Sequence, residues 1–193
     1  MIRSLLILST VILLSLPGYA RDLSGNLSGT LYDSTYNVVD HIYVQQGDSL
    51  IILPGAELVF ADTFNFEIEG YLYAVGTEQD SIKFLPDSGV SRGNINFNVT
   101  ALNSCQISYC LIIGGYTSGN RGSVYIDDCD CYISHCSITN NTANSGGGLH
   151  IHVGNPHISH CNISNNQASV GVGGGVYCYN NSPRFEYCIV SGN

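Results

Sequence analysis

The chain has 193 residues and a formal charge of −9, with 15 acidic residues against 6 lysines and arginines. Such a surface repels phosphate backbones, so the composition argues against nucleic acid as a partner. The length fits one domain once a leader is removed, and a surface rich in Asn, Ser, Gly and Tyr suits neutral glycans or proteins.

Residues 1–20 have the pattern of a secretory signal peptide. Arg3 gives a positive start, residues 5–16 form an apolar run, and Gly18-Tyr-Ala20 is a small-x-small cleavage site. The apolar run is too short for a membrane-spanning helix. We therefore predict that the mature protein does not span a membrane and is secreted, extracellular or held at the cell surface.

Residues 21–40 precede the first regular strand pattern. They carry scattered apolar side chains at Leu23, Leu27, Leu31 and Tyr32. We predict that this segment is an N-terminal cap, because a stack of strands has open edges that need covering.

From residue 41 onward, apolar and polar residues alternate in short runs that glycine and asparagine separate. No run has the period of a helix, whereas alternation predicts strands with one buried face. The apolar residues that open the first strand of each unit are Ile42, Phe66, Ile95, Val124, Leu149 and Val176.

The second half of the chain repeats one motif, which reads Ile107-Ser-Tyr-Cys110, Ile133-Ser-His-Cys136, Ile158-Ser-His-Cys161 and Phe185-Glu-Tyr-Cys188. Its cysteines step by 26, 25 and 27 residues, and a fixed period of this length indicates stacked units. We predict an all-β fold, a right-handed single-stranded parallel β-helix (solenoid) of about six coils over residues 41–193. Because the last repeat stops partway, we expect an open C-terminal end and a fragment of a longer protein.

Cysteine fills one slot of the repeat, at Cys110, Cys136, Cys161 and Cys188. Stacked neighbours lie about 4.8 Å apart, whereas the Cβ atoms of a disulfide lie about 3.8 Å apart. The sequence therefore predicts a ladder of buried, unbridged thiols that pack as small hydrophobic groups. Cys105 and Cys131 share a corner slot, where the backbone can adjust, and are the candidate disulfide.

Two parts of the chain resemble known bacterial proteins. Ile138-Thr-Asn-Asn-Thr-Ala143 with Gly146-Gly-Gly-Leu149, and the matching segment from Ile163 to Val176, resemble the repeats of polymorphic outer-membrane proteins, with Ile for the aromatic residue and Gly for Ala. Gly47–Gly55 and Glu69–Thr77 resemble the opening of secreted bacterial β-helix proteins. The resemblance implies a cell-surface, outer-membrane-associated β-helix. It does not imply one activity, because this fold carries adhesins, pectin lyases and glycosidases alike.

The first strands present two outward columns in the later coils. The first column reads Tyr125, His150, Tyr177, and the second reads Asp127, His152, Tyr179. Aromatic rings beside polar groups are what a sugar-binding surface needs, and in the β-helix enzymes that this chain resembles the same face commonly holds substrate. We expect this face to be exposed and to bind a ligand, the alternative being a solvated sheet surface decorated with tyrosine.

Two other sets on this face are candidates for chemistry. Glu67 and Glu69 project from one strand about 6.7 Å apart, within the separations that glycosidases use, although neighbouring outward glutamates are common. His150, His152 and Asp127 could ligate a divalent metal or could be ordinary surface residues. We predict no cofactor, because no cofactor-binding motif is present.

Three function classes stay open. The strict repeat and the lack of a catalytic motif favour a non-enzymatic, adhesin-like or structural surface protein. The alternatives are a carbohydrate-active enzyme that uses Glu67, Glu69 or acids in missing coils, and a glycan-binding module without turnover. The expected partners are a glycan or a host or cell-surface protein, and the truncated form could associate end to end.

Overall fold

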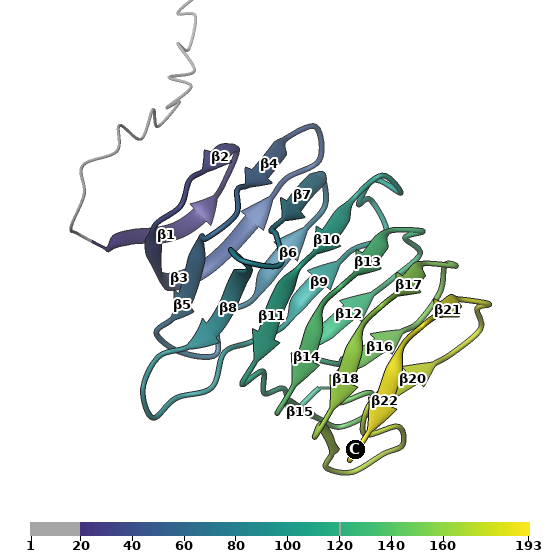
Figure 1. Ribbon diagram of the computed structural model, residues 1–193. Helices are drawn as coiled ribbons and strands as arrows, with labels where there is room; N and C mark the ends of the chain where they lie inside the picture. Colours follow the sequence, from purple (N-terminus) through teal and green to yellow (C-terminus); the bar gives the residue numbers. More distant parts are fainter. Residues whose placement is uncertain (1–19, 120) are drawn as a thin grey trace, which may run out of the picture.

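The computed structural model describes residues 20–119 and 121–193 (Figure 1). Apart from Ala20, the predicted signal peptide lies outside the described residues and stays a prediction. The described part folds as a parallel β-solenoid of about six turns without helices, which confirms the predicted parallel β-helix. Accordingly, this part contains no helix long and apolar enough to cross a membrane.

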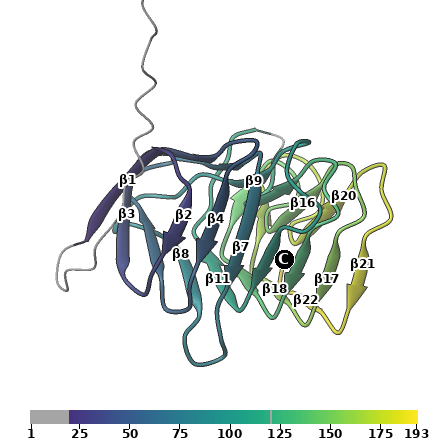
Figure 2. The ribbon, with the colours of Figure 1, turned by 90° about the horizontal axis from the view of Figure 1, so that it is seen from above.

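Each turn contributes short strands that pair in register with those of the next turn, and the pairs form three parallel ladders (Figures 1 and 2). The first ladder contains β6 (Phe66–Ile68), β9 (Ile95–Phe97), β12 (Val124–Ile126), β16 (Leu149–Ile151) and β20 (Val176–Cys178). The second contains β2 (Gly29–Leu31), β4 (Ser49–Ile52), β7 (Tyr71–Val75), β10 (Gln106–Ser108), β13 (Tyr132–Ser134), β17 (His157–Ser159) and β21 (Arg184–Glu186). The third contains β5 (Glu57–Phe60), β8 (Ile82–Pro86), β11 (Cys110–Ile113), β14 (Ser137–Thr139), β18 (Asn162–Ser164) and β22 (Ile189–Ser191).

The long strand β3 (Thr35–Val44) belongs to two ladders at once. Its residues 35–38 pair with β5 in the third ladder, and its residues 42–44 pair with β6 in the first. One continuous sheet therefore bends around the start of the solenoid, and the second ladder closes the remaining side. A short extra ladder joins β15 (Thr142–Ala143) to β19 (Gln167–Ala168).

The register of the first ladder is the one that the sequence predicted. Ile42 pairs with Phe66, Phe66 with Ile95, and the series continues through Val124 and Leu149 to Val176. Residues in one slot point the same way because parallel neighbours are in register. The apolar members of each strand therefore converge on one continuous core inside the coils.

The core is filled mainly by Ile, Leu, Val and Phe side chains that are fully buried. Burying one such side chain stabilises a fold by roughly 1.5–3 kcal/mol, and each coil adds several. The rings of Phe66 and Phe84 pack 6.3 Å apart between the first and third ladders. This contact lies within one coil, so the interior packs across each coil from one ladder to another.

A column of asparagines runs along the corner after the third ladder, with Asn141 and Asn166 buried and Asn193 exposed at its end. The side-chain oxygen of Asn166 accepts hydrogen bonds from the backbone N–H (3.1 Å) and the side-chain amide (2.9 Å) of Asn141. The side-chain oxygen of Asn193 accepts the equivalent hydrogen bonds from Asn166 (2.9 and 3.0 Å). Each side-chain amide also donates to a core-strand carbonyl, for example Asn166 to Ile138 (2.9 Å). Backbone groups that a sharp corner would leave unpaired are satisfied by these contacts.

One position of this column is occupied by Gly115, which has no side chain. Arg92 supplies the side-chain hydrogen bonds there. Its fully buried guanidinium donates to the Ser123 hydroxyl, to the side-chain oxygen of Asn141 (3.3 Å) and to the carbonyls of Gly93 (2.7 Å) and Ile113 (3.0 Å). Burial lowers the pKa of Arg92 to about 9, so the side chain stays charged at neutral pH. It links three successive coils through hydrogen bonds alone.

The two ends of the described chain differ. Residues 21–40, the predicted cap, form β1 (Arg21–Asn26), β2 and the first part of β3, and β1 pairs with β3 as the outermost strand. Leu23 and Leu31 of this segment are buried in the core. At the other end, Ile189 and Val190 of β22 are exposed.

Candidate ligand-binding face

The first ladder brings the predicted ligand-binding residues together. Tyr125, His150 and Tyr177 are direct partners on β12, β16 and β20. Two residues further along, Asp127, His152 and Tyr179 follow the same three strands. The two outward columns expected from the sequence therefore exist as neighbouring rows of side chains.

The expectation that this whole face is exposed is wrong. Tyr125 is only 7% exposed and His150 only 5%, whereas Tyr179 is 55% exposed. At His150 the cause is the loop before β16, which lies against this side chain. A Cβ atom on Gly146 would lie 2.9 Å from the Cβ of His150, and its φ is +62°. Only glycine allows the loop to approach the ring so closely.

Beside this loop the surface is concave. A cavity of about 410 Å³ is lined by Tyr125, Ser145, His150, His152, Tyr177 and Tyr179, and these residues are called the aromatic hollow below. Five of the six predicted ligand-binding residues line it. The sixth, Asp127, lies behind His152. Ser145, from the covering loop, was not predicted, because its position depends on the loop conformation.

The rings of the aromatic hollow are ordered by contacts with one another. His150 packs edge to face between Tyr125 (5.2 Å) and Tyr177 (4.8 Å), and His152 stacks on Tyr179 (5.6 Å, 7° between planes). Such arrangements suit the charge distribution of aromatic rings. The hollow is therefore lined by preset rings rather than by flexible side chains.

Charged groups fix two of these rings from outside. The carboxylate of Asp127 lies 3.0 Å from Nδ1 of His152, and the guanidinium of Arg121 lies 4.9 Å from the ring centre of Tyr125. Burial, and then the negative charge of Asp127, raise the pKa of the Tyr125 hydroxyl. Tyr125 is therefore a neutral hydrogen-bonding group at physiological pH.

The three residues predicted as a metal set are not arranged around a common point. His152 bonds directly to Asp127, while His150 packs between two tyrosine rings. In residues 20–119 and 121–193, no group of three or more His, Cys, Asp or Glu side chains is placed to hold a metal ion.

The candidate catalytic residues Glu67 and Glu69 lie on the same face, two to four coils before the hollow. The Glu67 carboxylate accepts hydrogen bonds from the side-chain amides of Asn65 (3.2 Å), Asn96 (2.7 Å) and Asn98 (3.1 Å). A carboxylate held by three amides is an ordered structural acceptor. Neither glutamate lines the aromatic hollow.

The predicted thiol ladder lies inside the solenoid. Cys110, Cys136 and Cys161 are buried, and Cys188, in the last coil, is half-buried. Each thiol donates to the carbonyl two residues earlier, at 3.1–3.3 Å. A hydrogen bond with Cys136, together with burial, raises the pKa of Cys161 well above its usual range.

The candidate disulfide partners share their corner with a third cysteine. Cys105 and Cys131 are buried in adjacent coils, and the Cys129 thiol is hydrogen-bonded to that of Cys131. Burial raises the pKa of Cys105 to about 11. The structure contains these cysteines as thiols, and the pairing of Cys105 with Cys131 stays a prediction.

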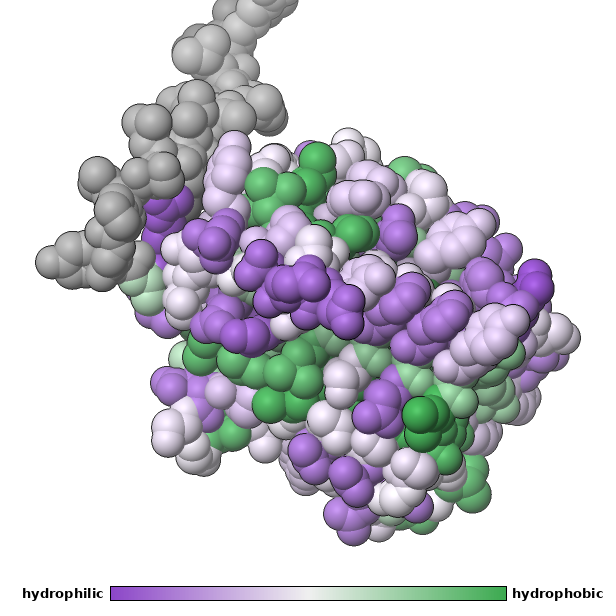
Figure 3. All heavy atoms as spheres, in the orientation of Figure 1, coloured by the Kyte–Doolittle hydropathy of each residue, from purple (hydrophilic) through white to green (hydrophobic). Residues whose placement is uncertain are grey.

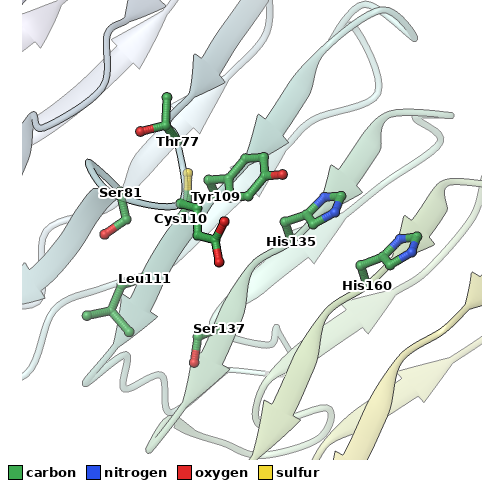
Figure 4. A pocket seen from close by; sticks show the side chains of 9 residues that line it. Thr77, Ser81, Tyr109, Cys110, Leu111, His135, Ser137 and His160 are labelled. Atoms are coloured by element: carbon green, nitrogen blue, oxygen red, sulfur yellow. The ribbon is translucent and has the colours of Figure 1, made fainter.

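Sequence reasoning missed a second set of aligned rings. Tyr109, His135, His160 and Tyr187, called the ring column below, stack at 4.5, 4.7 and 4.9 Å. Each lies at the corner between the second and third ladders and has a φ of 50–53°. Figure 4 shows the first three rings following one another across successive coils. The signal was present in the sequence, as the third residue of the repeated motif.

Comparison with known proteins identifies no relative: no family model, no curated protein and no solved structure matches the chain. The resemblance to polymorphic outer-membrane proteins therefore stays a prediction. Any function has to be inferred from the fold and from the geometry of its surfaces.

Proposed function

We propose that this protein is a secreted or cell-surface β-helix with an adhesin-like role, and that it contacts a glycan through the aromatic hollow without changing it chemically. The observation that carries the proposal is the convergence of five rings on one cavity of about 410 Å³. Sugar rings have apolar faces that pack on aromatic side chains and hydroxyl groups that need polar partners.

The polar groups of the aromatic hollow suit an uncharged, hydroxyl-rich ligand. Ser145, the tyrosine hydroxyls and the imidazole nitrogens can each donate or accept hydrogen bonds. The chain as a whole is acidic, with a formal charge of −9, which disfavours anionic ligands. The surface in Figure 3 is mostly hydrophilic or intermediate with separate apolar patches, as expected for a protein that works in water.

Contact without turnover is favoured over catalysis by the position of the acids. Glycoside hydrolysis needs two carboxyl groups on either side of the scissile bond. Asp127, the carboxylate nearest the hollow, is paired with His152 (3.0 Å), and Glu67 is engaged by three amides outside it. A carbohydrate-active enzyme remains the alternative that the experiment has to test.

The test is a glycan array probed with the mature protein, followed by calorimetric titration of any glycan that binds. Tyr179→Ala removes an exposed ring from the hollow and should weaken binding about tenfold or more. Losing one ring contact worth about 1.4 kcal/mol corresponds to a tenfold change in affinity. Tyr132→Ala is the matched control, because Tyr132 is similarly exposed (50%) on β13 and does not line the hollow.

An assay for reducing ends and unsaturated products should be run with the same glycans. Release of product that is lost in Glu67→Gln would overturn the proposal in favour of an enzyme. If no glycan binds at millimolar concentration, the proposed glycan contact is wrong and a structural or protein-binding role is left.

A further inference from the structure

The ring column ends at Tyr109 because the preceding coil turns this corner differently. In the later coils one or two residues connect the second ladder to the third, whereas here a six-residue loop, Gly76–Ser81, connects β7 to β8. The loop is anchored where Gly76 N–H donates to the Ser108 carbonyl (2.9 Å) and Ile82 N–H donates to the Tyr109 carbonyl (3.2 Å). The loop therefore projects beside Tyr109, the ring at this end of the column.

The loop has a defined shape. Thr77 N–H donates to the Asp80 carbonyl (3.1 Å), and Asp80 N–H donates to the Thr77 hydroxyl (3.0 Å). Of the two residues inside this turn, Glu78 and Gln79, Glu78 lines the same cavity as the rings of the column. Lys83, the nearest basic residue in the sequence, is already paired with Glu57 at 2.6 Å.

Loop and column together line a second, open cavity of about 620 Å³, and Glu78 is one of its lining residues. Ser81 comes from the loop, the rings of Tyr109, His135 and His160 form one wall, and Leu111 and Ser137 lie on the adjoining third-ladder strands (Figure 4). We call it the corner hollow. It shares no lining residue with the aromatic hollow.

The lining of the corner hollow specifies a kind of ligand. Leu111 and the rings offer apolar surface, while Ser81, Ser137 and the imidazole nitrogens offer hydrogen bonds to hydroxyl groups. Glu78 accepts hydrogen bonds only and contributes a negative charge, which favours a cationic donor near an aromatic ring. Phosphorylated or acidic ligands are disfavoured by the same charge.

We propose that the corner hollow binds an amino sugar, with a pyranose unit against the Tyr109–His135 wall and its ammonium group on the carboxylate of Glu78. This site is separate from the aromatic hollow and does not depend on the function proposed for it. The ring column supplies one contact per coil, so an oligosaccharide that runs along the solenoid axis meets His135 and then His160.

The test uses the glucosamine trimer and its fully N-acetylated counterpart, which share a skeleton and differ in charge. Histidine ring proton signals, assigned with single His→Gln variants, report each hollow separately. The glucosamine trimer should shift the signals of His135 and His160 in a saturable way. Glu78→Gln should weaken binding about tenfold, the effect of removing one charge-assisted hydrogen bond, and the N-acetylated trimer should bind more weakly to wild type.

Tyr109→Asn should abolish the shifts while the protein stays folded, because asparagine tolerates the left-handed corner. Tyr187→Asn is the matched control, because it makes the same change at the far ring of the same column, 82% exposed and outside the hollow. The proposal is overturned if millimolar trimer leaves His135 and His160 unshifted, if Glu78→Gln binds like wild type, or if the N-acetylated trimer binds equally well. Loss of glycan binding in Tyr179→Ala would not affect this site, so the two proposals fail independently.

Discussion

The imidazole rings of His135 and His160 lie face to face, 4.7 Å apart and within 1° of parallel, although 25 residues separate them in the sequence. Both residues have a φ of 53°, in the left-handed region that non-glycine residues rarely adopt. The spacing matches the distance of about 4.8 Å between neighbouring strands. The coil repeat itself therefore sets the stack, and the stack compensates part of the cost of the corner backbone.

The contributions of the corner backbone and of ring stacking to stability can be separated by substitution at His135. His135→Asn keeps a residue that tolerates positive φ and loses the stack, so it should destabilise the protein by about 1 kcal/mol. His135→Val also loses the stack and places a β-branched residue at positive φ, which should cost about 1–3 kcal/mol more. Urea denaturation followed by circular dichroism measures both. Equal losses for the two variants would show that the corner is not strained.

The asparagine column should make a large contribution to stability. Asn166→Ala removes a buried amide that serves Asn141 and the Ile138 carbonyl, and should lower the free energy of unfolding by about 2–4 kcal/mol because several buried groups lose their partners. Asn162→Ala, at an exposed position in the same coil, should stay within about 0.5 kcal/mol of wild type. Thermal and urea unfolding of both variants check this. A loss below 1 kcal/mol or so for Asn166→Ala would mean that water replaces the amide.

The two columns of the aromatic hollow should differ in their effect on stability. Tyr125→Ala removes a ring that the covering loop buries, so we expect a loss of about 3 kcal/mol or more. Tyr179→Ala removes an exposed ring and should change stability by no more than about 0.5 kcal/mol. Differential scanning calorimetry of both variants measures the contrast. If Tyr125→Ala were as mild as Tyr179→Ala, the loop would not cover the face in solution.

The thiol ladder should make the protein sensitive to alkaline pH. Burial raises the pKa of Cys136, and a hydrogen bond with Cys136 raises that of Cys161, so the folded state holds these protons more tightly than the unfolded state. This contribution is complete below the ordinary thiol pKa of about 8.5–9 and is lost as the pH rises above it. The free energy of unfolding should therefore fall between pH 8 and pH 10, and by less in Cys161→Ala.

A direct measurement accompanies this titration. In the native protein at pH 8, a thiol reagent should reach the exposed Cys178 before the buried Cys136 and Cys161. Titration of the denatured, unreduced protein should recover the ladder cysteines as free thiols. Finding them oxidised would show that stacked neighbours can be bridged.

The fold could be predicted because the spacing of the repeat determines how the strands of neighbouring coils pair. A spacing of 25–27 residues between equivalent cysteines fixes which residue stacks on which, and alternation fixes which of them face inward. Ile42, Val124 and Leu149 therefore occupy the predicted slots. Asparagine, which separates the short runs in the sequence, also suits the corners of the coils, since Asn165 adopts a left-handed φ of 55°.

The surface could be predicted only in part, because it depends on loops that do not repeat. Alternation correctly placed Tyr125 and His150 outward from the core, but it did not predict their burial, which at His150 involves a loop that passes against the side chain at Gly146. Asn141 and Asn166 keep the period of the cysteines, yet their role depends on side-chain hydrogen bonds that the pattern does not contain. The corner hollow arises where the loop Gly76–Ser81 departs from the repeat, so its ring wall has a periodic signal but its Glu78 end has none.

Because the columns of the later coils have one member per coil, they can be extended by gene duplication without other changes to the sequence. A tandem copy of one 25-residue coil, the spacing between Val124 and Leu149, would insert a cysteine, an asparagine, a corner ring and a first-strand ring at once. Each would meet the same neighbours as before, and the rod would lengthen by about 4.8 Å. Variants with different coil numbers could then fit ligands of different length with the same side chains.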